Sequence, residues 1–149
     1  MTLVATGNAI EALVDAVKTH LDGDAELGAL VTGVYGFVPA ASRQTHPYVR
    51  IGSQAILQDD FGAMQTAGGR VVFTLDSWSA AKGPHTMRTV LARLLVLLER
   101  VDLTLAFHVL AGGSLHCTLS GVDEEPDEDM PDRVLYHGRQ EWEALVEEM

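Results

Sequence analysis

The chain has 149 residues, of which 47% are hydrophobic, and this length suits one compact domain over residues 1–149 and leaves no room for two enzyme domains. Its 10 Lys and Arg residues stand against 21 Asp and Glu residues, and the resulting formal net charge of −11 argues against nucleic-acid binding through a basic face. The single cysteine, Cys117, excludes an internal disulfide and a multi-cysteine zinc site.

The sequence shows no signal for secretion or membrane insertion. Residues 1–6 have no basic segment and no sustained apolar run. The longest aliphatic run, Leu94–Leu98, is far shorter than the roughly 20 residues of a membrane span. We therefore expect no membrane partner, and either a soluble intracellular product or a component of a particle assembled from one.

The first predicted element is a helix over residues 8–22, because apolar residues recur there at helical spacing. Asn8 and Glu11 stand at capping positions, and Gly23 follows the last turn. A second, short helical segment is expected over residues 24–31.

Three extended segments follow. Residues 34–38 form a short candidate strand that Pro39 ends, and residues 48–57 and 70–78 are rich in strand-forming residues. Residues 58–69, which contain two aspartates and several glycines, join the last two segments. The pattern predicts a hairpin with a long mobile tip.

The clearest predicted helix begins at Pro84, a residue tolerated in the first helical turn, and ends near Arg100. Its apolar face is too wide for a surface helix, so we expect it to be the central packing element. Its outer strip carries three arginines, Arg88, Arg93 and Arg100.

Two further strands are expected towards the C-terminus. Residues 106–120 are strand-like with a break at a glycine pair, and residues 133–146 alternate between apolar and polar side chains. Residues 141–149 also have a good helix-forming composition, which competes with the strand interpretation there. Residues 123–132 hold seven acidic residues and two prolines, so we expect an exposed and mobile acidic loop between the strands.

Together these elements predict an α+β fold, with a mostly antiparallel sheet of four to five strands and two main helices packed on one face. Strands joined by hairpin-length loops favour antiparallel pairing, and the helices must bury their apolar faces on the sheet. The other face of the sheet, and the edge formed by the long final strand, remain to be covered by something.

The sequence offers no catalytic, cofactor-binding or metal site. The glycine pairs lack the partner residues of a phosphate loop, and the acidic segment lacks the glycine and the final glutamate of a calcium loop. The six histidines form no metal-binding pair at helical spacing, although a triad could still assemble in space. Cys117 and His116 are strand neighbours that point to opposite faces, and Ser79 lacks a nucleophile elbow. We therefore expect that the protein is not an enzyme and needs no cofactor.

The order of elements, together with several short motifs, resembles the tail-completion or tail-terminator family of long-tailed bacteriophages and gene transfer agents. The most telling pieces are the strand Pro47–Gly52, which reads P-Y-V-x-I-G, and the strand end Asp76–Ser79, which reads D-x-W-S. Val38-Pro39, Gly83 and the Leu-rich helix that follows it add to the likeness. The resemblance extends over essentially the whole chain, and the acidic insert at 123–132 is longer than the family pattern.

The resemblance implies a structural virion protein with no catalytic residues. Such a protein forms a homo-hexameric ring that caps the tail tube, ends its polymerisation and joins the tail to the head connector or stopper. DNA passes through the lumen without specific binding, which suits an acidic wall. The implied partners are other copies of the chain, the major tail-tube protein and the head-tail connector. The implied location is the tail or neck of a virion or phage-like particle that is assembled in the host cytoplasm.

Two sets of residues are candidates for these contacts. The hairpin tip is a candidate docking loop through Asp59, Asp60, Phe61 and Met64. Candidate inter-subunit or lumen charges are Arg88, Arg93, Arg100, Asp123, Glu124, Glu125, Asp127, Glu128 and Asp129.

Two alternatives stay open. The chain could be a different neck component, such as a head-tail stopper or adaptor, that also forms a ring but binds on the head side. A small metal-dependent or hydrolytic enzyme is the second alternative, although the sequence provides no site for it.

Overall fold

Three helices lie in the part of the chain that the computed structural model describes, namely residues 9–36, 46–57, 69–80, 83–127, 130 and 132–148. They are α1 (Ala9–Asp22), α2 (Ala25–Leu30) and α3 (His85–Leu98). The spacing of their buried side chains explains why each helix packs along one stripe. None of these helices is long and apolar enough to cross a membrane.

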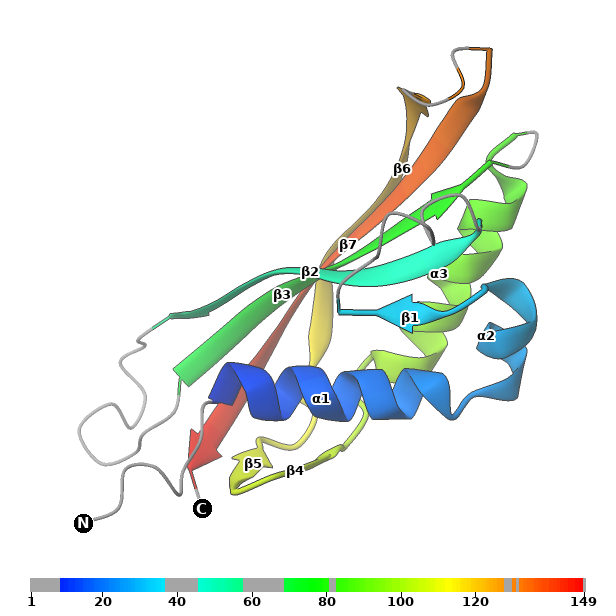
Figure 1. Ribbon diagram of the computed structural model, residues 1–149. Coiled ribbons are helices and arrows are strands. Elements are labelled where there is room, and N and C mark those ends of the chain that lie inside the picture. Colours follow the sequence, from blue (N-terminus) through cyan, green and yellow to red (C-terminus); the bar gives the residue numbers. More distant parts are fainter. Residues whose placement is uncertain are drawn as a thin grey trace.

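The described residues also form seven strands in one sheet. They are β1 (Val34–Tyr35), β2 (Tyr48–Leu57), β3 (Gly69–Ser79), β4 (Thr104–Leu105), β5 (His108–Leu110), β6 (His116–Pro126) and β7 (Val134–Glu148). The strand order is β1-β2-β3-β7-β5-β4, and β6 pairs with β7 beside β5. Only the β1–β2 pair among them is parallel, so the sheet is mixed. Figure 1 shows the strongly twisted sheet with α1 and α3 packed along it.

The observed sheet has more strands than the four to five that the sequence predicts. β1 lies within the predicted segment 34–38, whereas β4 is not predicted and the single strand predicted over 106–120 is divided into β5 and β6; β4 and β5 have only two or three residues each. Such short strands are invisible to an alternation test that needs at least four residues. The α+β class is confirmed: α1 and α3 are the two main helices, and α2 is the short helical segment predicted over residues 24–31.

The final strand is not an edge of the sheet, contrary to the sequence prediction. β7 pairs with β3 along one side and with β6 and β5 along the other. This position explains why the residues after Glu141 form a strand despite their helix-forming composition. Their backbone groups are paired on both sides, and burial of alternate side chains outweighs local propensity.

The core lies between the helices and one face of β3 and β7. Phe73 of β3 stacks against Trp142 of β7, with ring centroids 6.5 Å apart. The amide of Gln140, which is fully buried, donates to the carbonyl of Leu91 in α3 and accepts from the indole of Trp142. These contacts place α3 against this face of the sheet.

A glycine in β7 allows α3 to approach the sheet closely. A Cβ atom at Gly138 would lie 2.5 Å from Sδ of Met87 and 3.0 Å from a methyl carbon of Leu91. Gly138→Val is therefore expected to lower the free energy of unfolding by about 1–3 kcal/mol through overpacking, measured by urea denaturation. Gly121→Val on the neighbouring strand is the matched control, because a Cβ there meets nothing within 4 Å. Equal stability of the two variants would contradict the close packing.

Candidate assembly surfaces

The face of the sheet away from α3, here called the open face, carries a row of side chains across four strands, three of which contribute an aromatic ring. Tyr48 of β2, Trp78 of β3 and His137 of β7 are opposite one another in register, and Asp123 of β6 completes the row. The rings of Tyr48 and Trp78 lie 5.4 Å apart. Those of Trp78 and His137 lie 4.6 Å apart and are stacked, with an angle of 5° between the ring planes. The row therefore links strands that are far apart in the sequence.

His137 lies between two carboxylates on this face. Its Nε2 lies 2.8 Å from Oδ1 of Asp76, and its Nδ1 lies 2.8 Å from Oε1 of Glu125. Thr74 donates a second hydrogen bond to Asp76, 3.0 Å long, and the guanidinium of Arg50 lies 4.0 Å from the same carboxylate. The arrangement, here called the His137 cluster, joins β2, β3, β7 and β6 by side-chain contacts.

The His137 cluster favours the charged form of its members. Hydrogen bonding to Asp76, with a further contribution from Glu125, raises the pKa of His137 above its usual value although burial opposes the shift. Burial, the largest influence on Asp76, would raise its pKa, but the hydrogen bonds from His137 and Thr74 together lower it. Both ring nitrogens of a protonated His137 donate, so one imidazolium satisfies two carboxylates at once.

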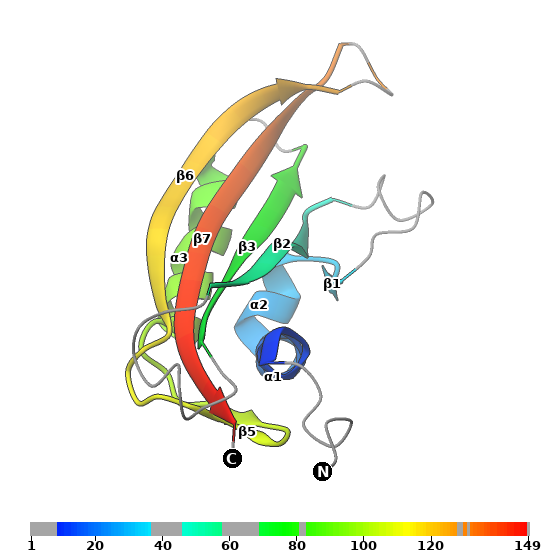
Figure 2. The ribbon, with the colours of Figure 1, turned by 90° about the vertical axis from the view of Figure 1, so that its left-hand side faces the viewer.

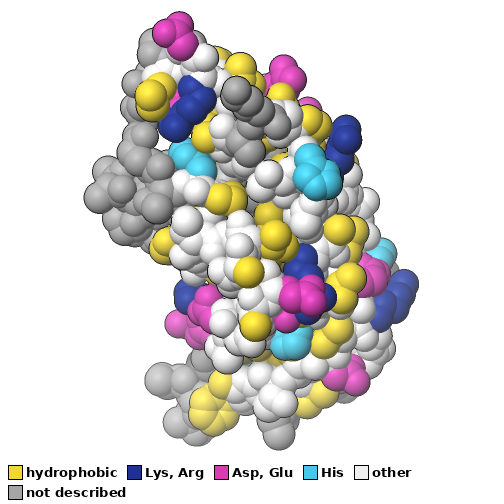
Figure 3. All heavy atoms as spheres, turned by 90° about the vertical axis from the view of Figure 1, so that its right-hand side faces the viewer, with side chains coloured by type: hydrophobic (Ala, Val, Ile, Leu, Met, Phe, Trp, Pro, Cys, Tyr) yellow, Lys and Arg dark blue, Asp and Glu magenta, His cyan; other side chains and the backbone are white. Residues whose placement is uncertain are grey.

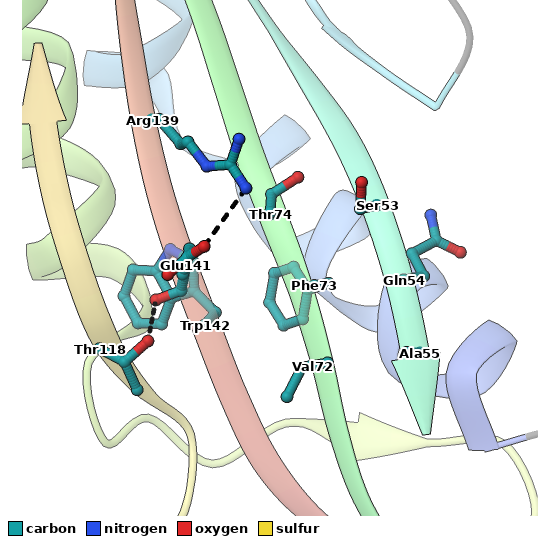
Figure 4. Close-up of a pocket in the computed structure, with 10 residues that line it drawn as sticks. All are labelled: Ser53, Gln54, Ala55, Val72, Phe73, Thr74, Thr118, Arg139, Glu141 and Trp142. Atoms are coloured by element: carbon teal, nitrogen blue, oxygen red, sulfur yellow. Dashed lines mark hydrogen bonds and ion pairs between the residues drawn. The ribbon is translucent and has the colours of Figure 1, made fainter. Parts of the chain in front are cut away.

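A shallow hollow of about 350 Å³ lies on the open face beside this cluster. Figure 4 shows the hollow between β2 and β6. Arg139 is directed towards Glu141, and Thr118 of β6 lies on the side opposite to β2. Arg139 donates to Oε1 of Glu141 at 3.2 Å, and the Thr118 hydroxyl donates to the Glu141 carbonyl. The hollow offers hydrogen-bonding groups suited to a polar contact.

The sequence predicts that the acidic segment is a mobile loop, but the structure shows that part of it is a strand. Asp123, Glu124 and Glu125 belong to β6, which extends to Pro126. Asp127 is buried, and the Nε of Arg133 donates to its Oδ2 at 2.7 Å. Pairing with β7 recruits these acidic residues into a strand because it satisfies their backbone groups, a gain that composition alone does not reveal. Two other predicted residues of this group, Glu128 and Asp129, lie outside the described residues.

Of the three arginines predicted on the helix from Pro84, Arg88 and Arg93 lie on α3, whereas Arg100 lies beyond its end at Leu98. Two of the three contact other residues of the chain. Arg93 forms two hydrogen bonds of 2.9 and 2.7 Å to Asp24, the residue that caps α2, and these bonds hold the pKa of Asp24 at about 2. Arg100 donates to the carbonyl of Gly113 at 2.7 Å. Arg88 is exposed and has no charged partner within the described ranges. Figure 3 shows that arginines on the face with α2 and α3 are scattered among acidic and hydrophobic side chains and form no basic band.

Exposed apolar side chains gather at the two ends of β7. Phe107 and Val109, from the hairpin of β4 and β5, are exposed at its C-terminal end, where Val109 pairs with Glu147. Met130 and Val134 are exposed at its N-terminal end. Figures 1 and 2 show β6 and β7 extending beyond the rest of the sheet at that end. The molecule thus presents one apolar surface at each end of its longest strand.

Phe107 is exposed in an unfavourable backbone conformation. Its φ of 59° lies in the left-handed region, which is costly for a residue with a bulky side chain. Its side chain is 63% exposed. Retaining an aromatic side chain there costs stability in the isolated chain and brings no core burial.

The predicted docking loop, with Asp59, Asp60, Phe61 and Met64, lies outside the described residues. The strands that bound this segment end at Leu57 and Gly69. Gly69 pairs with Val146, and Val146 also pairs with Leu110 of β5. The start of β3 therefore lies at the same end of the sheet as β5.

The described part of the chain contains no group of side chains assembled for the chemistry that the enzyme alternative would require. No group of three His, Cys, Asp or Glu side chains could hold a metal ion there. The thiol of Cys117 is half-buried, burial raises its pKa, and it donates to the carbonyl of Leu119. His116 contacts Glu143 at 3.1 Å.

The His137 cluster is the feature that sequence reasoning missed. Its members come from β2, β3, β6 and β7, so only the pairing register brings them together. The sequence contained one signal. Asp76 and Trp78 are two residues apart in β3, on the face of the strand opposite to that of the apolar residues. A carboxylate inside a strand that is otherwise apolar requires a partner.

Comparison with known proteins agrees with this architecture. The model of the family described as tail completion protein gp17 matches residues 15–147. A chain in the solved structure titled "Virion of native gene transfer agent (GTA) particle" is similar with a TM-score of 0.74 and 26% identity, covering 95% of this chain and 98% of that chain. Comparison with curated proteins finds no match. The chain therefore belongs to the tail completion protein gp17 family and is a structural protein of a phage-like tail.

Proposed function

We propose that this protein forms a ring at the end of the tail tube, ends the polymerisation of the tube and joins it to the head connector. The observation that supports this role is the pair of apolar surfaces at opposite ends of β7. Val134 and Glu147 are separated by a continuous strand, which corresponds to about 40 Å at the usual rise per residue. A protein inserted between two partners needs one contact surface on each side.

The end with Phe107 is the proposed tube side. β3, the strand that follows the candidate docking loop in the sequence, begins at this end, because Gly69 pairs with Val146. An exposed phenylalanine with an unfavourable φ angle suits a residue that contacts a partner in the assembly. The opposite end, with Met130 and Val134, is then the proposed head side.

The proposed ring is a homo-hexamer with DNA passing through its lumen. The formal net charge of −11 suits a wall that repels phosphates and lets the duplex slide. The gene transfer agent particle that contains the structural neighbour provides a comparable setting.

Electron microscopy of particles that lack this protein tests the proposed role. Overlong tails are expected, because nothing would stop the tube from growing. Normal tails on DNA-filled heads that leak would instead identify a head-side stopper or adaptor and would contradict the tube-capping role.

Phe107→Asn is expected to reduce capping of purified tail tubes while the free energy of unfolding rises by about 1 kcal/mol, because asparagine tolerates the left-handed backbone better. The measurements are tube binding in a sedimentation assay and urea denaturation. A loss of binding accompanied by a gain of stability separates a contact role from a folding role. Phe61→Ser together with Met64→Ser is expected to reduce docking in the same assay.

Val96→Gln is the matched control for these variants. Val96 is 67% exposed, as accessible as Phe107, but it lies on α3 away from either end of β7. This variant should cap tubes as the unaltered chain does. Undiminished capping by Phe107→Asn would remove the β4–β5 hairpin from the proposed tube surface.

A further inference from the structure

We propose that His137 is a proton-dependent latch, which fixes the outer end of the β6–β7 hairpin to β3 when its ring is charged and releases Glu125 when the ring is neutral. The outer end comprises residues 125–127 and 132–135. β3 pairs with β7 only as far as Tyr136, whereas the β6–β7 ladder continues to Pro126 and Val134. Figures 1 and 2 show this end beyond the rest of the sheet. The latch concerns motion within one chain and does not depend on the proposed ring or tube contact.

The outer end is closed by bonds of its own. The backbone N–H of Asp127 donates to the carbonyl of Arg133 at 3.1 Å, and Nε of Arg133 donates to Oδ2 of Asp127 at 2.7 Å. The Tyr136 hydroxyl donates to Glu124 at 3.3 Å. These bonds lie within the hairpin and do not reach β3. A two-stranded ribbon twists more than a sheet and is marginally stable by itself. The orientation of the outer end therefore depends on its side-chain link to a third strand.

His137 supplies this link across β7. Its two ring nitrogens each lie 2.8 Å from a carboxylate, Asp76 on β3 and Glu125 on β6. The stacked indole of Trp78 holds the plane of the ring. Both contacts need an N–H donor on the ring, and only the imidazolium form has two. The link from β6 to β3 is therefore complete only when His137 is protonated at both nitrogens.

The neutral ring keeps one of the two contacts, and burial decides which. The Asp76 side chain is 8% exposed, whereas that of Glu125 is 44% exposed. A buried acceptor that loses its donor costs more free energy than an exposed one, because water can satisfy the exposed oxygen. The remaining proton therefore stays on Nε2, which faces Asp76. The lone pair of Nδ1 then faces the Glu125 carboxylate, which turns to solvent and frees the β6 side of the hairpin.

The charged groups around the ring favour the closed latch. They are Asp76 of β3, Arg50 of β2, Glu125 and Asp123 of β6, and Arg139 of β7, which is opposite Asp76 in register. Hydrogen bonding to Asp76 is the largest influence on the pKa of His137 and raises it, together with Glu125, although burial opposes the shift. The latch is therefore mostly closed at pH 6.5 and opens as the pH rises through the raised pKa.

Pulsed electron paramagnetic resonance between two spin labels tests the latch. In a Cys117→Ser background, one label is attached at Val134→Cys on the outer end and the other at Asp15→Cys on α1, and both positions are exposed. Val134 and His137 are three residues apart in β7 and face opposite sides, so the label leaves the latch intact. The distance distribution should be narrow at about pH 6 and should broaden reversibly at about pH 9. Equally narrow distributions at both pH values would overturn the proposal.

Glu125→Ala and Glu124→Ala form a matched pair, because each removes one carboxylate from the same end of β6. Glu125→Ala should give the broad distribution at both pH values. Glu124 contacts Tyr136 and not the ring of His137, so Glu124→Ala should keep the pH response. A narrow distribution for Glu125→Ala at the lower pH would show that another contact holds the outer end and would overturn the latch. Circular dichroism checks that both variants are folded.

The position of the remaining proton is a second readout, and it is measured in the unaltered chain. NMR of the imidazole nitrogens distinguishes the two neutral tautomers, and the resonances of His137 are identified by their absence in His137→Gln. At about pH 9 the proton is expected on Nε2, towards Asp76. A proton on Nδ1 would keep the contact with Glu125 and would overturn the release of the outer end.

Discussion

Trp142→Ala is expected to lower the free energy of unfolding by about 3–5 kcal/mol, measured by urea denaturation followed by circular dichroism. Trp142 is among the largest fully buried side chains of the described residues and stacks on Phe73. Its removal leaves a cavity between β7 and the helices that the paired strands cannot close. The buried Oε1 of Gln140 also loses its indole donor.

Trp142→Phe divides this effect into two contributions. The variant keeps an aromatic ring beside Phe73 but has no N–H group for Gln140, so a loss of about 1–3 kcal/mol is expected from the unsatisfied oxygen together with the smaller ring. Val72→Ala is the control. Val72 lies on the other face of β3 and is half-buried, so removal of its two methyl groups should lower the free energy of unfolding by less. A Trp142→Ala variant as stable as Val72→Ala would contradict the assignment of Trp142 to the core.

His137→Leu is expected to lower the free energy of unfolding by about 3 kcal/mol at pH 6, since it leaves the buried carboxylate of Asp76 without its nearest partner. Arg50 and Thr74 still contact Asp76 in this variant. The loss of unfolding free energy is therefore at the lower end of the range expected when one partner of a buried ion pair is removed. The double variant with Asp76→Asn should be more stable than the sum of the single effects, because no unpaired charge then remains.

The pH dependence follows from the same cluster. The pKa of His137 is raised in the folded chain, so its contribution is fully present below pH 6.5 and is lost as the pH rises through the raised value. The pKa of Asp76 is lowered, so its contribution is present above pH 3.8 and is lost as the pH falls through the lowered value. Glu125, Asp123 and Arg50 are the other charged groups near the ring.

Urea midpoints of the unaltered chain should therefore decline from pH 6 to pH 8. The decline should be smaller in His137→Leu, which has no imidazole at this position. His85→Leu is the control, since this histidine is exposed at the start of α3. The same decline in all three proteins would contradict the contribution of the His137 cluster.

The elements with strong periodicity were predictable to within a residue or two. The helix predicted over 8–22 is α1, and the segment predicted over 48–57 is β2 with the same bounds. The helix predicted from Pro84 is α3, which ends at Leu98, two residues before the predicted end. In these segments local preference and tertiary packing favour the same structure, so the pattern was sufficient.

The errors occurred where pairing outweighs composition. Acidic residues of β6 were expected in a loop, and β7 was expected at an edge of the sheet. Neither could be corrected from the chain order, because strand pairing depends on register between segments that are distant in sequence. The candidate charges illustrate the same limit: Arg93 contacts Asp24, a residue that sequence spacing gave no reason to choose.

The sequence by itself determined the α+β class, the helices, the longest strands and a resemblance that the family match confirms. These properties depend on the spacing of apolar side chains and on short motifs, which are local. Only the tertiary structure decided that β7 is central, that β6 has an unpaired edge, and that His137 lies between Asp76 and Glu125. The physical reason is that these features depend on strand register. The residues that a strand contacts are fixed only when the whole sheet has folded, and no local sequence pattern specifies that alignment.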